Sequence, residues 1–394
     1  MTQVILRDII SLNKGKKPTA IHSESSGRLF PYVDIKAFET GIIDKFTDGE
    51  KCISCEDGDL LIVCDGSRSG LIGKAVKGYV GSTLARIDCD KSVNKDYLYY
   101  FLLGKYKQLN SNVKGTGTPH LKQDLLKSFS IYLPSIEEQQ QIVYQLEESL
   151  SMLDSAAAAL KKTKQQLEIY RQAVLKEAFE GGLTESELTS LSLLKNYIEK
   201  PKYGTSKKCG YSITADSKPV YRIPNIDTDR MRIDKQDIKY ADFTNDELEK
   251  INLLDQDILI IRSNGSASLV GKPAIIQKED IDATFAGYLM RLRILNHNDL
   301  LPRFLLWYLQ SHQARVYIEG KAKSTSGVHN INSGEISSLQ IPFFTIEEQK
   351  KIVDAIESRI SECDNIEQTV NQSLHQAEAL RQSIFKQAFE EGIK

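Results

Sequence analysis

A long segment that occurs twice constrains the fold of this chain more than any other feature of its sequence. The first copy opens with LPSIEEQQQIV at Leu133, and the second opens with IPFFTIEEQKKIV at Ile341. From Ile136 onward each residue matches the one 210 positions later, without a gap, so that Arg171 falls on Arg381. The chain therefore consists of a module and a repeated segment, followed by a second module and a second repeated segment.

Each copy carries an apolar seam with alternating spacings of three and four residues, which is typical of a coiled-coil helix. The seam residues are Val143, Leu146, Leu150, Leu153, Ala157, Leu160, Leu167, Val174 and Ala178 in the first copy, and Val353, Ile356, Ile360, Cys363, Val370, Leu374, Ala377, Ile384 and Ala388 in the second. Ser135 with Glu138, and Thr345 with Glu348, form capping boxes that predict both helix starts. About 45 residues at 1.5 Å each predict a rod of roughly 65–70 Å.

The order of module, helix, module and helix favours antiparallel pairing of the helices, with the two halves related by a pseudo-two-fold axis. Lys164 and Arg171 interrupt the first seam, and Glu367 and Arg381 interrupt the second. With the helix centres aligned antiparallel, Lys164 lies close to Glu367, and such a pair would set direction and register more than stability. The alternative is that both side chains extend out of the seam into solvent.

The modules combine short apolar runs, such as Leu60–Val63 and Ser128–Pro134, with Gly and Asp, which predicts short strands. Asp96–Tyr106 is apolar and aromatic with helical spacing and predicts a buried helix. The predicted fold class is α+β: two β-rich mixed α/β modules separated by two long antiparallel coiled-coil helices, in a pseudo-two-fold tandem duplication. The predicted segments are 1–134 and 184–342 for the modules, and 135–183 and 343–394 for the helices.

Several landmarks of the first module recur in the same order in the second. The matched pairs are Leu6 with Leu194, Asp59 with Asp257, Gly66 with Gly265, Lys74 with Lys272, Tyr97 with Phe304, and His120 with His329. If both modules bind DNA and each binds a different sequence, we expect the residues that they share to serve the scaffold or to contact phosphate. Divergent neighbours, such as Arg68 against Ala267 and Asp65 against Asn264, are then better candidates for reading bases.

The formal net charge of −2 divides into +4 for 1–134, −3 for 135–183, +1 for 184–342 and −4 for 343–394. The helices are acidic and the modules neutral to basic, so we expect any DNA to bind the modules. The candidate DNA-binding residues are Lys14, Lys16, Lys17, Ser67, Arg68, Ser69, Lys74, Lys114, Thr116, Thr118, His120, Lys202, Tyr203, Thr205, Ser206, Lys207, Asn264, Ser266, Ser268, Lys272, Lys323, Ser324, Thr325, Ser326 and His329. Lysines, hydroxyls and backbone N–H groups suit phosphate, and Arg or Asn suits base edges.

The sequence carries no catalytic signature that we recognise: it has no HExxH pair, no GxSxG motif and no glycine-rich cofactor loop. Cys52 and Cys55 have a zinc-like spacing but no second close pair, so we expect reduced thiols and no metal. The chain lacks a run of about 18 apolar residues and a signal-peptide layout, so we expect a cytoplasmic protein without a membrane span.

The IEEQxxIV opening after Leu-Pro or Ile-Pro, the long heptad and the shared RQ…AFE ending resemble the specificity subunit of type I restriction–modification systems. This resemblance covers the whole chain. It implies a non-catalytic subunit with two target-recognition domains, each of which reads one half of a split, asymmetric site in double-stranded DNA. It further implies that the helices fix the gap and dock two methyltransferase subunits, which hold S-adenosylmethionine and methylate adenine, and that restriction subunits then join. One departure is that little helical sequence precedes the first module, so circular closure rests on the C-terminal helix.

The competing interpretation is a protein-interaction scaffold, in which a coiled-coil rod carries two β-rich modules that bind proteins. The charge difference between helices and modules is small enough to permit it. An enzyme with an unfamiliar site is a third interpretation, which methyl transfer by the chain alone would establish. Steep inverse salt dependence of DNA binding separates the first interpretation from the second.

Overall fold

A computed structural model describes residues 2–27, 29–111, 119–180, 182–183, 190–325 and 327–391. The chain divides into two compact units. Unit 1 comprises Met1–Lys161 and Asn371–Lys394, and unit 2 comprises Lys162–Val370. Both boundaries fall inside a long helix, so each unit holds one module and one half of each helix.

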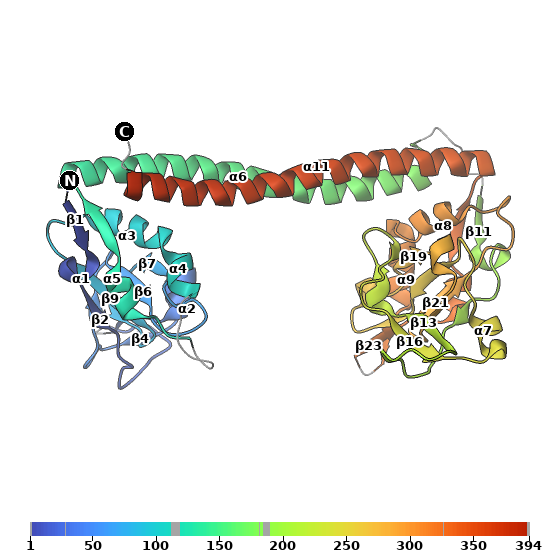
Figure 1. Ribbon diagram of the computed structural model, residues 1–394, viewed down its shortest axis with the longest axis horizontal. Helices are drawn as coiled ribbons and strands as arrows, with labels where there is room; N and C mark the ends of the chain where they lie inside the picture. Colours follow the sequence, from blue (N-terminus) through green and yellow to red (C-terminus); the bar gives the residue numbers. More distant parts are fainter. Residues whose placement is uncertain are drawn as a thin grey trace. The chain divides into compact units, whose positions relative to one another are not determined.

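The two repeated segments form the long helices α6 (Ile136–Phe179) and α11 (Ile346–Lys386), and α11 continues into a π-helical turn, Gln387–Glu391 (Figure 1). Both predicted capping boxes are present. The Ser135 hydroxyl accepts from the Glu138 N–H at 3.3 Å, while the Ser135 N–H donates to the Glu138 carboxylate at 3.0 Å. Thr345 and Glu348 repeat this exchange. The first orphan N–H groups of each helix are thereby satisfied.

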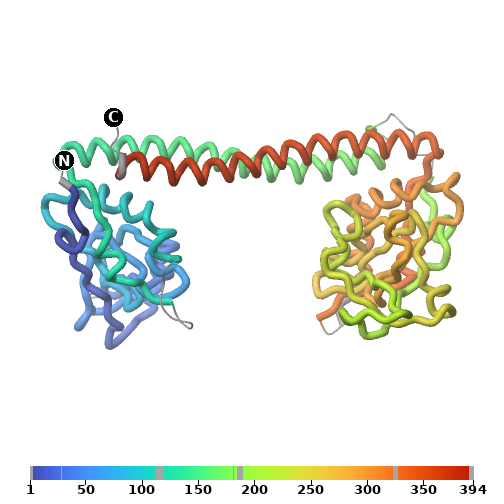
Figure 2. The backbone as a smooth tube through the Cα atoms, in the orientation of Figure 1, coloured from blue at the N-terminus to red at the C-terminus, as the bar shows by residue number. Residues whose placement is uncertain are grey.

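Within each unit the two helix halves run antiparallel. In unit 2, Arg171 contacts Asp364 at 2.6 Å and Glu177 contacts Arg359 at 3.6 Å, so positions rise along α6 as they fall along α11. In unit 1, Arg381 pairs with Asp154. The predicted seam is largely buried; its members with at most 8% exposure are Val143, Leu146, Leu150, Leu167, Val174, Ala178, Val353, Ile356, Cys363, Val370 and Ala388. The traces of α6 and α11 wind past each other within each unit (Figure 2).

The module of unit 1 contains two four-stranded sheets, ordered β2-β9-β6-β7 and β4-β3-β8-β5, and a β1-β10 pair. Its strands are β1 (Thr2–Ile5), β2 (Ile10–Lys14), β3 (Phe30–Val33), β4 (Phe46–Thr47), β5 (Ser54–Cys55), β6 (Leu60–Val63), β7 (Ile72–Lys74), β8 (Gly78–Val80), β9 (Leu84–Cys89) and β10 (Ser130–Leu133). Its helices are α1 (Leu6–Ile9), α2 (Ile35–Thr40), α3 (Lys95–Gly104), α4 (Tyr106–Ser111) and α5 (Gln123–Ser128). The predicted strand β6 is buried at every position, and α3 is the predicted buried helix.

The module of unit 2 repeats this plan with the sheet β12-β21-β17-β19, the three-stranded sheet β16-β13-β20 and the pair β11-β24, and adds the sheet β18-β23-β22 and the pair β14-β15. Its strands are β11 (Ser190–Leu193), β12 (Lys202–Tyr203), β13 (Ser217–Tyr221), β14 (Ile226–Asp227), β15 (Arg232–Ile233), β16 (Lys239–Asp242), β17 (Ile258–Ile261), β18 (Ser263–Asn264), β19 (Pro273–Ile275), β20 (Thr284–Phe285), β21 (Leu289–Leu292), β22 (Lys323–Thr325), β23 (Val328–Asn330) and β24 (Gln340–Phe343). Its α-helices are α7 (Asn245–Ile251), α8 (Pro302–Tyr308), α9 (His312–Lys321) and α10 (Ser333–Ser337). The predicted fold class, including the tandem duplication, is confirmed.

A buried glutamine joins each module to the first turn of the long helix that follows it. The Gln139 side chain accepts from the Asn94 N–H at 2.8 Å and donates to the carbonyls of Ser92 and Pro134. Gln349, 210 positions later, makes the same three bonds with Leu301, Asp299 and Phe344. Both glutamines are at most 2% exposed. Since each side chain satisfies three backbone groups away from solvent, each joint is rigid.

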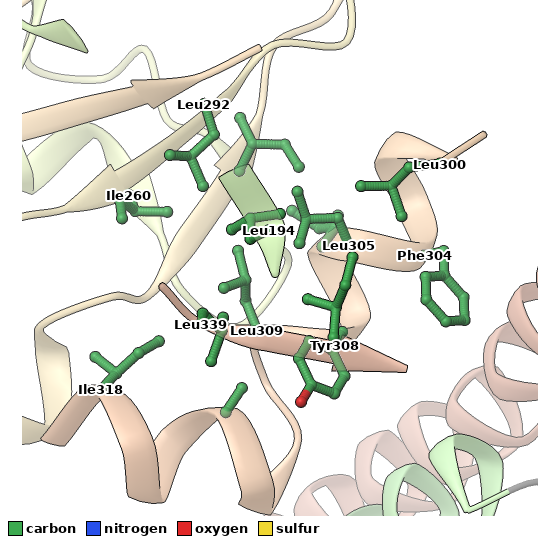
Figure 3. Close-up of a cluster of buried hydrophobic side chains, with 14 of the residues drawn as sticks. Leu194, Ile260, Leu292, Leu300, Phe304, Leu305, Tyr308, Leu309, Ile318 and Leu339 are labelled. Carbon is green, nitrogen blue, oxygen red and sulfur yellow. The ribbon is translucent and has the colours of Figure 1, made fainter. Parts of the chain in front are cut away.

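The other end of each helix packs on the module of the same unit through an aromatic side chain. In unit 1, Phe389 of the α11 end meets Tyr97 and Phe101 of α3, with ring centroids 5.1 and 5.5 Å apart. In unit 2, Phe179 at the end of α6 meets Phe304 and Tyr308 of α8 at 5.3 and 5.1 Å. Figure 3 shows Phe304 and Tyr308 at the edge of the cluster of buried side chains that fills this module. Each module therefore contacts the start of one long helix and the end of the other.

The hydrogen-bond register corrects three of the predicted matches between the modules. The central strands β6 and β17 do match, but Lys74 pairs with Leu60 at the position where Ile275, not Lys272, pairs with Ile258. The glycines that correspond are Gly70 and Gly271: both have φ between +79° and +93°, and each donates its N–H to the last residue of the central strand. Gly66 and Gly265 do not correspond either, as the next pairing shows.

His120 and His329 are also offset by one residue. His120 lies opposite Asp65, whereas the corresponding bridge in unit 2 joins Asn330 to Ser263, and His329 lies opposite Asn264. A shift of one residue turns a side chain to the other face of a strand. The true counterpart of His120 is Asn330, that of Asp65 is Ser263, and that of Gly66 is Asn264. The loop after the central strand is three residues longer in unit 2, which accounts for the offset of three positions between Lys272 and Ile275, the true counterpart of Lys74.

Within the described residues, no helix has both the length and the apolar character that crossing a membrane requires. All six cysteines are unpaired, and Cys55, Cys64 and Cys363 are buried. Burial raises the pKa of the Cys55 and Cys64 thiols to about 11, which keeps both groups neutral and unreactive. Among the described residues, the structure brings together no group of His, Cys, Asp and Glu that could hold a metal ion.

Candidate nucleic-acid interface

In unit 1, three side chains from distant parts of the sequence meet where the central strand ends. Asp65 follows β6, and its carboxylate contacts Lys14 Nζ at 2.9 Å and His120 Nδ1 at 2.7 Å. The side chains of Lys14 and His120 are 51% and 59% exposed, whereas that of Asp65 is 18% exposed. Asp65 thus holds two exposed nitrogen groups side by side, and both of its oxygens are engaged.

The electrostatics of this cluster favour charge on Asp65 and on Lys14. Partial burial opposes ionisation of Asp65, but hydrogen bonds from Lys14 and His120 outweigh it and hold the pKa of this carboxyl below its usual value. The hydrogen bond that Lys14 donates to Asp65 in turn raises the pKa of Lys14. Lys14 therefore presents its remaining ammonium donors, which suit phosphate oxygens or the acceptor edge of guanine. Asp65 supports these donors, and its oxygens are unavailable as acceptors for a base.

The remaining candidates of unit 1 occupy varied surroundings. Arg68 is exposed and pairs with Glu39 at 2.9 Å. Ser69 is fully buried, and its hydroxyl bonds to the carbonyls of its own loop, so it shapes the turn. Lys74 pairs with Asp96 at 2.7 Å, 5.5 Å above the centre of the Tyr99 ring. The candidates Lys16, Lys17 and Ser67 lie on the surface. Lys114, Thr116 and Thr118 lie outside the described residues.

In unit 2, the corresponding place holds an aromatic ring and a guanidinium group. Arg262 lies over the Tyr203 ring, with its Cζ 4.3 Å from the ring centre. Arg262 Nη1 donates to the Gly287 carbonyl at 2.9 Å, and the Tyr203 hydroxyl accepts from the Ser333 N–H, also at 2.9 Å. Sequence reasoning missed Arg262. Its partner Tyr203 is 59 positions away, so no local motif signals the stack.

Two lysines of unit 2 are engaged within the protein. Lys272 is half-buried and donates to Gln310 at 2.6 Å, and burial lowers the pKa of its ammonium group. Lys207 pairs with Glu247 at 2.7 Å. The ammonium group of Lys272 is therefore engaged within the module, and its expected role, in the scaffold or at phosphate, stays a prediction.

The other candidates of unit 2 lie in the loops around Arg262 or outside the described residues. Asn264 accepts from the Ser266 N–H, and the hydroxyls of Ser266 and Ser268 are 2.9 Å apart. His329 Nδ1 lies 3.0 Å from the Ala322 carbonyl. Thr205 accepts from the Lys207 N–H, and Lys202 and Ser206 are exposed. Lys323, Ser324 and Thr325 form β22, but their side chains are not described, and Ser326 lies outside the described residues.

On the coiled coil, Lys164 Nζ lies 3.1 Å from Glu367 Oε1, in the contact expected from the seam. Arg171 adds a bond to Glu367 at 2.9 Å and one to Asp364 at 2.6 Å. Hydrogen bonds from Arg171 and Lys164 lower the pKa of Glu367. The four side chains form a charged network on the unit 2 half of the seam, and its role in setting the helix register stays a prediction.

Known proteins share both the sequence pattern and the fold. The family model of the type I restriction modification DNA specificity domain matches residues 1–169 and 186–376. The chain is 27% identical over 347 residues to the StySPI specificity subunit of Salmonella potsdam, which covers 84% of this chain and 74% of that one. It is 25% identical over 398 residues to the MjaVIII specificity subunit of Methanocaldococcus jannaschii. That match covers 97% of this chain and 90% of the relative.

Two solved structures have the same fold at lower identity. The HsdS subunit from Thermoanaerobacter tengcongensis gives a TM-score of 0.60 at 17% identity and covers 100% of this chain and 97% of that chain. A chain from work on complex assembly and conformational transition of the type I R-M system gives a TM-score of 0.77 at 16% identity. The match covers 100% of this chain and 98% of that chain. Because the family model spans both modules and most of both long helices, this protein belongs to the family of type I restriction–modification DNA specificity subunits.

Proposed function

We propose that this chain, itself non-catalytic, directs a type I restriction–modification complex to a bipartite site in double-stranded DNA. The module of each unit reads one half-site, and the long helices set the spacer between the half-sites. Two methyltransferase subunits, which carry S-adenosylmethionine, dock on the chain, and restriction subunits complete the nuclease. The family to which the chain belongs supports the DNA-directing role. The finer assignments rest on the duplicated architecture.

One observation carries the proposal: the two modules hold different side chains at the same place on the same scaffold. In the strand register of unit 1, Lys14 lies opposite Ala85, and Ala85 lies opposite Ile62 of the central strand. In unit 2, Tyr203 lies opposite Met290 in the same way, and Met290 lies opposite Ile260 of the central strand. Lys14 and Tyr203 therefore correspond. One place carries the charged pair of Lys14 and Asp65 with His120 beside it, and the other is aromatic and cationic through Tyr203 and Arg262. Two readers of unlike sequences need a common frame and unlike contacts.

The long helices offer a surface for protein partners. Their acidic segments expose large apolar side chains in both units, and those at least 50% exposed are Tyr144, Met152, Ile169 and Leu380. Exposed apolar side chains on a coiled coil do not serve its own seam, and such groups are enriched where proteins associate. This supports docking of the methyltransferase subunits along α6 and α11.

Two measurements test the proposal. Methylome sequencing of a strain with and without this gene should reveal one bipartite methylated motif that depends on it. Deleting one heptad from α6 and the facing heptad from α11 keeps the seam in phase and removes about 10 Å of helix, equivalent to about three base pairs. We expect the spacer to shorten while both half-sites stay the same. An unchanged spacer would refute the role of the helices.

A salt titration tests the competing role of a protein scaffold. DNA binding by the complex should fall steeply as salt rises, because lysine and arginine contacts release counterions from phosphate. A flat response, or no binding with the methyltransferase subunits present, would favour the scaffold.

A further inference from the structure

Arg262 is the exception among the half-buried arginines that the structure describes. The others each lie within 4.0 Å of a carboxylate, namely Arg86, Arg171, Arg222, Arg293, Arg303, Arg315, Arg359 and Arg381. Arg262 has no carboxylate partner among the described residues, and its buried Nε has no hydrogen-bond partner there. A cation that is partly removed from water without a counter-charge is costly, and such a group calls for an acceptor outside the unit.

The guanidinium group of Arg262 is held at two points within the unit. Its Cζ lies over the Tyr203 ring, and its Nη1 donates to the Gly287 carbonyl. Tyr203 is itself held by the N–H of Ser333 at the start of α10. A planar fork held in this way loses little freedom on binding and is suited to a ligand with two acceptors side by side.

The residue at this position differs between the two units. Arg262 follows the central strand of unit 2, and its carbonyl accepts from the Ile331 N–H at 3.0 Å, as the Cys64 carbonyl accepts from the Leu121 N–H at 2.8 Å. Unit 1 thus has a buried thiol where unit 2 has the guanidinium. Figure 1 shows β23, which pairs with the strand after Arg262, at the end of unit 2 opposite α8. A contact that only one unit can make is able to tell two half-sites apart, which a shared phosphate contact is not.

We infer that Arg262, held on Tyr203, reads a guanine through its O6 and N7 acceptors in the half-site of unit 2. Among base edges in the major groove, guanine offers two adjacent acceptors that match the arginine fork. Tyr203 acts as the positioning residue, since its ring lies against the guanidinium group of Arg262. This inference rests on the proposed function and adds to it one base and one reader.

The test is selection from a randomised duplex pool by the full chain with its methyltransferase subunits, followed by sequencing. Arg262→Lys keeps the charge but removes the fork. We expect preference for one guanine, in one half-site only, to weaken on the order of 10- to 100-fold. Tyr203→Leu should relax the same position to a smaller extent, and Tyr203→Phe, which keeps the ring but loses the bond from the Ser333 N–H, should relax it less than Tyr203→Leu does. The matched control is Arg230→Lys, at an arginine 83% exposed in the same unit, which should leave the selected sequence unchanged.

Each outcome has a separate meaning. If the unmodified complex selects no sequence, the proposed function fails. If it selects a bipartite sequence and Arg262→Lys retains every preference, or weakens binding equally on all sequences, Arg262 contacts phosphate or nothing, and the inference is overturned. Circular dichroism of each variant checks that the unit still folds, and Arg262→Lys remains informative if Arg262→Ala does not fold.

Discussion

The two halves of the coiled coil come from one repeated sequence, yet they hold their charges differently. Both contain an arginine–aspartate pair at equivalent positions: Arg171 with Asp364 in unit 2, and Arg381 with Asp154 in unit 1. Unit 2 adds Lys164 and Glu367 to its pair. The residues 210 positions away, in unit 1, are Leu374 and Ala157. One half is therefore cross-linked by a charged network where the other carries apolar side chains.

This difference separates the features that both units keep from those that have changed since the duplication. The glutamine and phenylalanine that join helix to module are the same in both units, because each joint solves the same packing problem. The charged network and the groups at the end of the central strand differ. Under the proposed function, these are the places that would distinguish the two halves, either for the partner helix or for DNA. Charged groups within a seam add specificity more readily than stability, which fits the presence of Lys164 and Glu367 in one half only.

The largest effect should come from a feature that the units share. Phe179→Ala and Phe389→Ala each remove a buried ring from a helix end, and each should lower the free energy of unfolding by about 3–5 kcal/mol. Urea unfolding followed by circular dichroism measures both. Ile169→Ala, at a position 70% exposed on α6, is the control and should change stability little. Strongly unequal losses for the two phenylalanines would show that the two helix ends are not equivalent anchors.

Sequence predicted the helices well because their signals are local. The seam and the capping boxes follow from spacing along one helix, and the contact of Lys164 with Glu367 follows from the antiparallel alignment of the two helix centres. The modules were harder, since strand register depends on hydrogen bonds between distant segments. Matching His120 with His329 by letter shifted the pairing by one residue, and neighbouring residues of a strand face opposite sides of the sheet. Arg262 could not be identified from the sequence, because its partner Tyr203 lies near it only in the folded chain.

The buried glutamines should have the next largest effect, again equal in the two units. Gln139→Ala and Gln349→Ala each leave backbone groups without partners in a buried joint, so we expect each to cost about 2–3 kcal/mol. Gln140→Ala, at the exposed neighbouring position on α6, should be close to neutral. If one of the two glutamine variants were as stable as Gln140→Ala, the two joints would not be equivalent.

Glu367 tests where the halves differ. Glu367→Ala leaves Lys164 and Arg171 without their shared partner and should cost about 1 kcal/mol, because the network is partly exposed. Adding Lys164→Leu gives unit 2 the pattern of unit 1, and we expect this double variant to regain most of the loss. Urea unfolding of the single and double variants measures the coupling. A double variant less stable than Glu367→Ala would mean that the charged network stabilises the chain rather than selecting its register.

The smallest effect is a dependence on pH that only unit 2 should supply through this network. Because Arg171 and Lys164 lower the pKa of Glu367 in the folded chain, the stabilisation is complete above the unfolded value of about 4.3 and is lost as pH falls through the folded value. Glu367→Gln lacks this carboxyl, so the difference in urea midpoint between the unmodified chain and Glu367→Gln should shrink as pH falls from 6 to 3. The Lys164→Leu and Glu367→Ala double variant also lacks the carboxyl and should lose the same component of acid sensitivity. A difference that stays constant across this range would mean that Glu367 is not held ionised by its partners, and the contrast between the two halves would then be one of shape rather than charge.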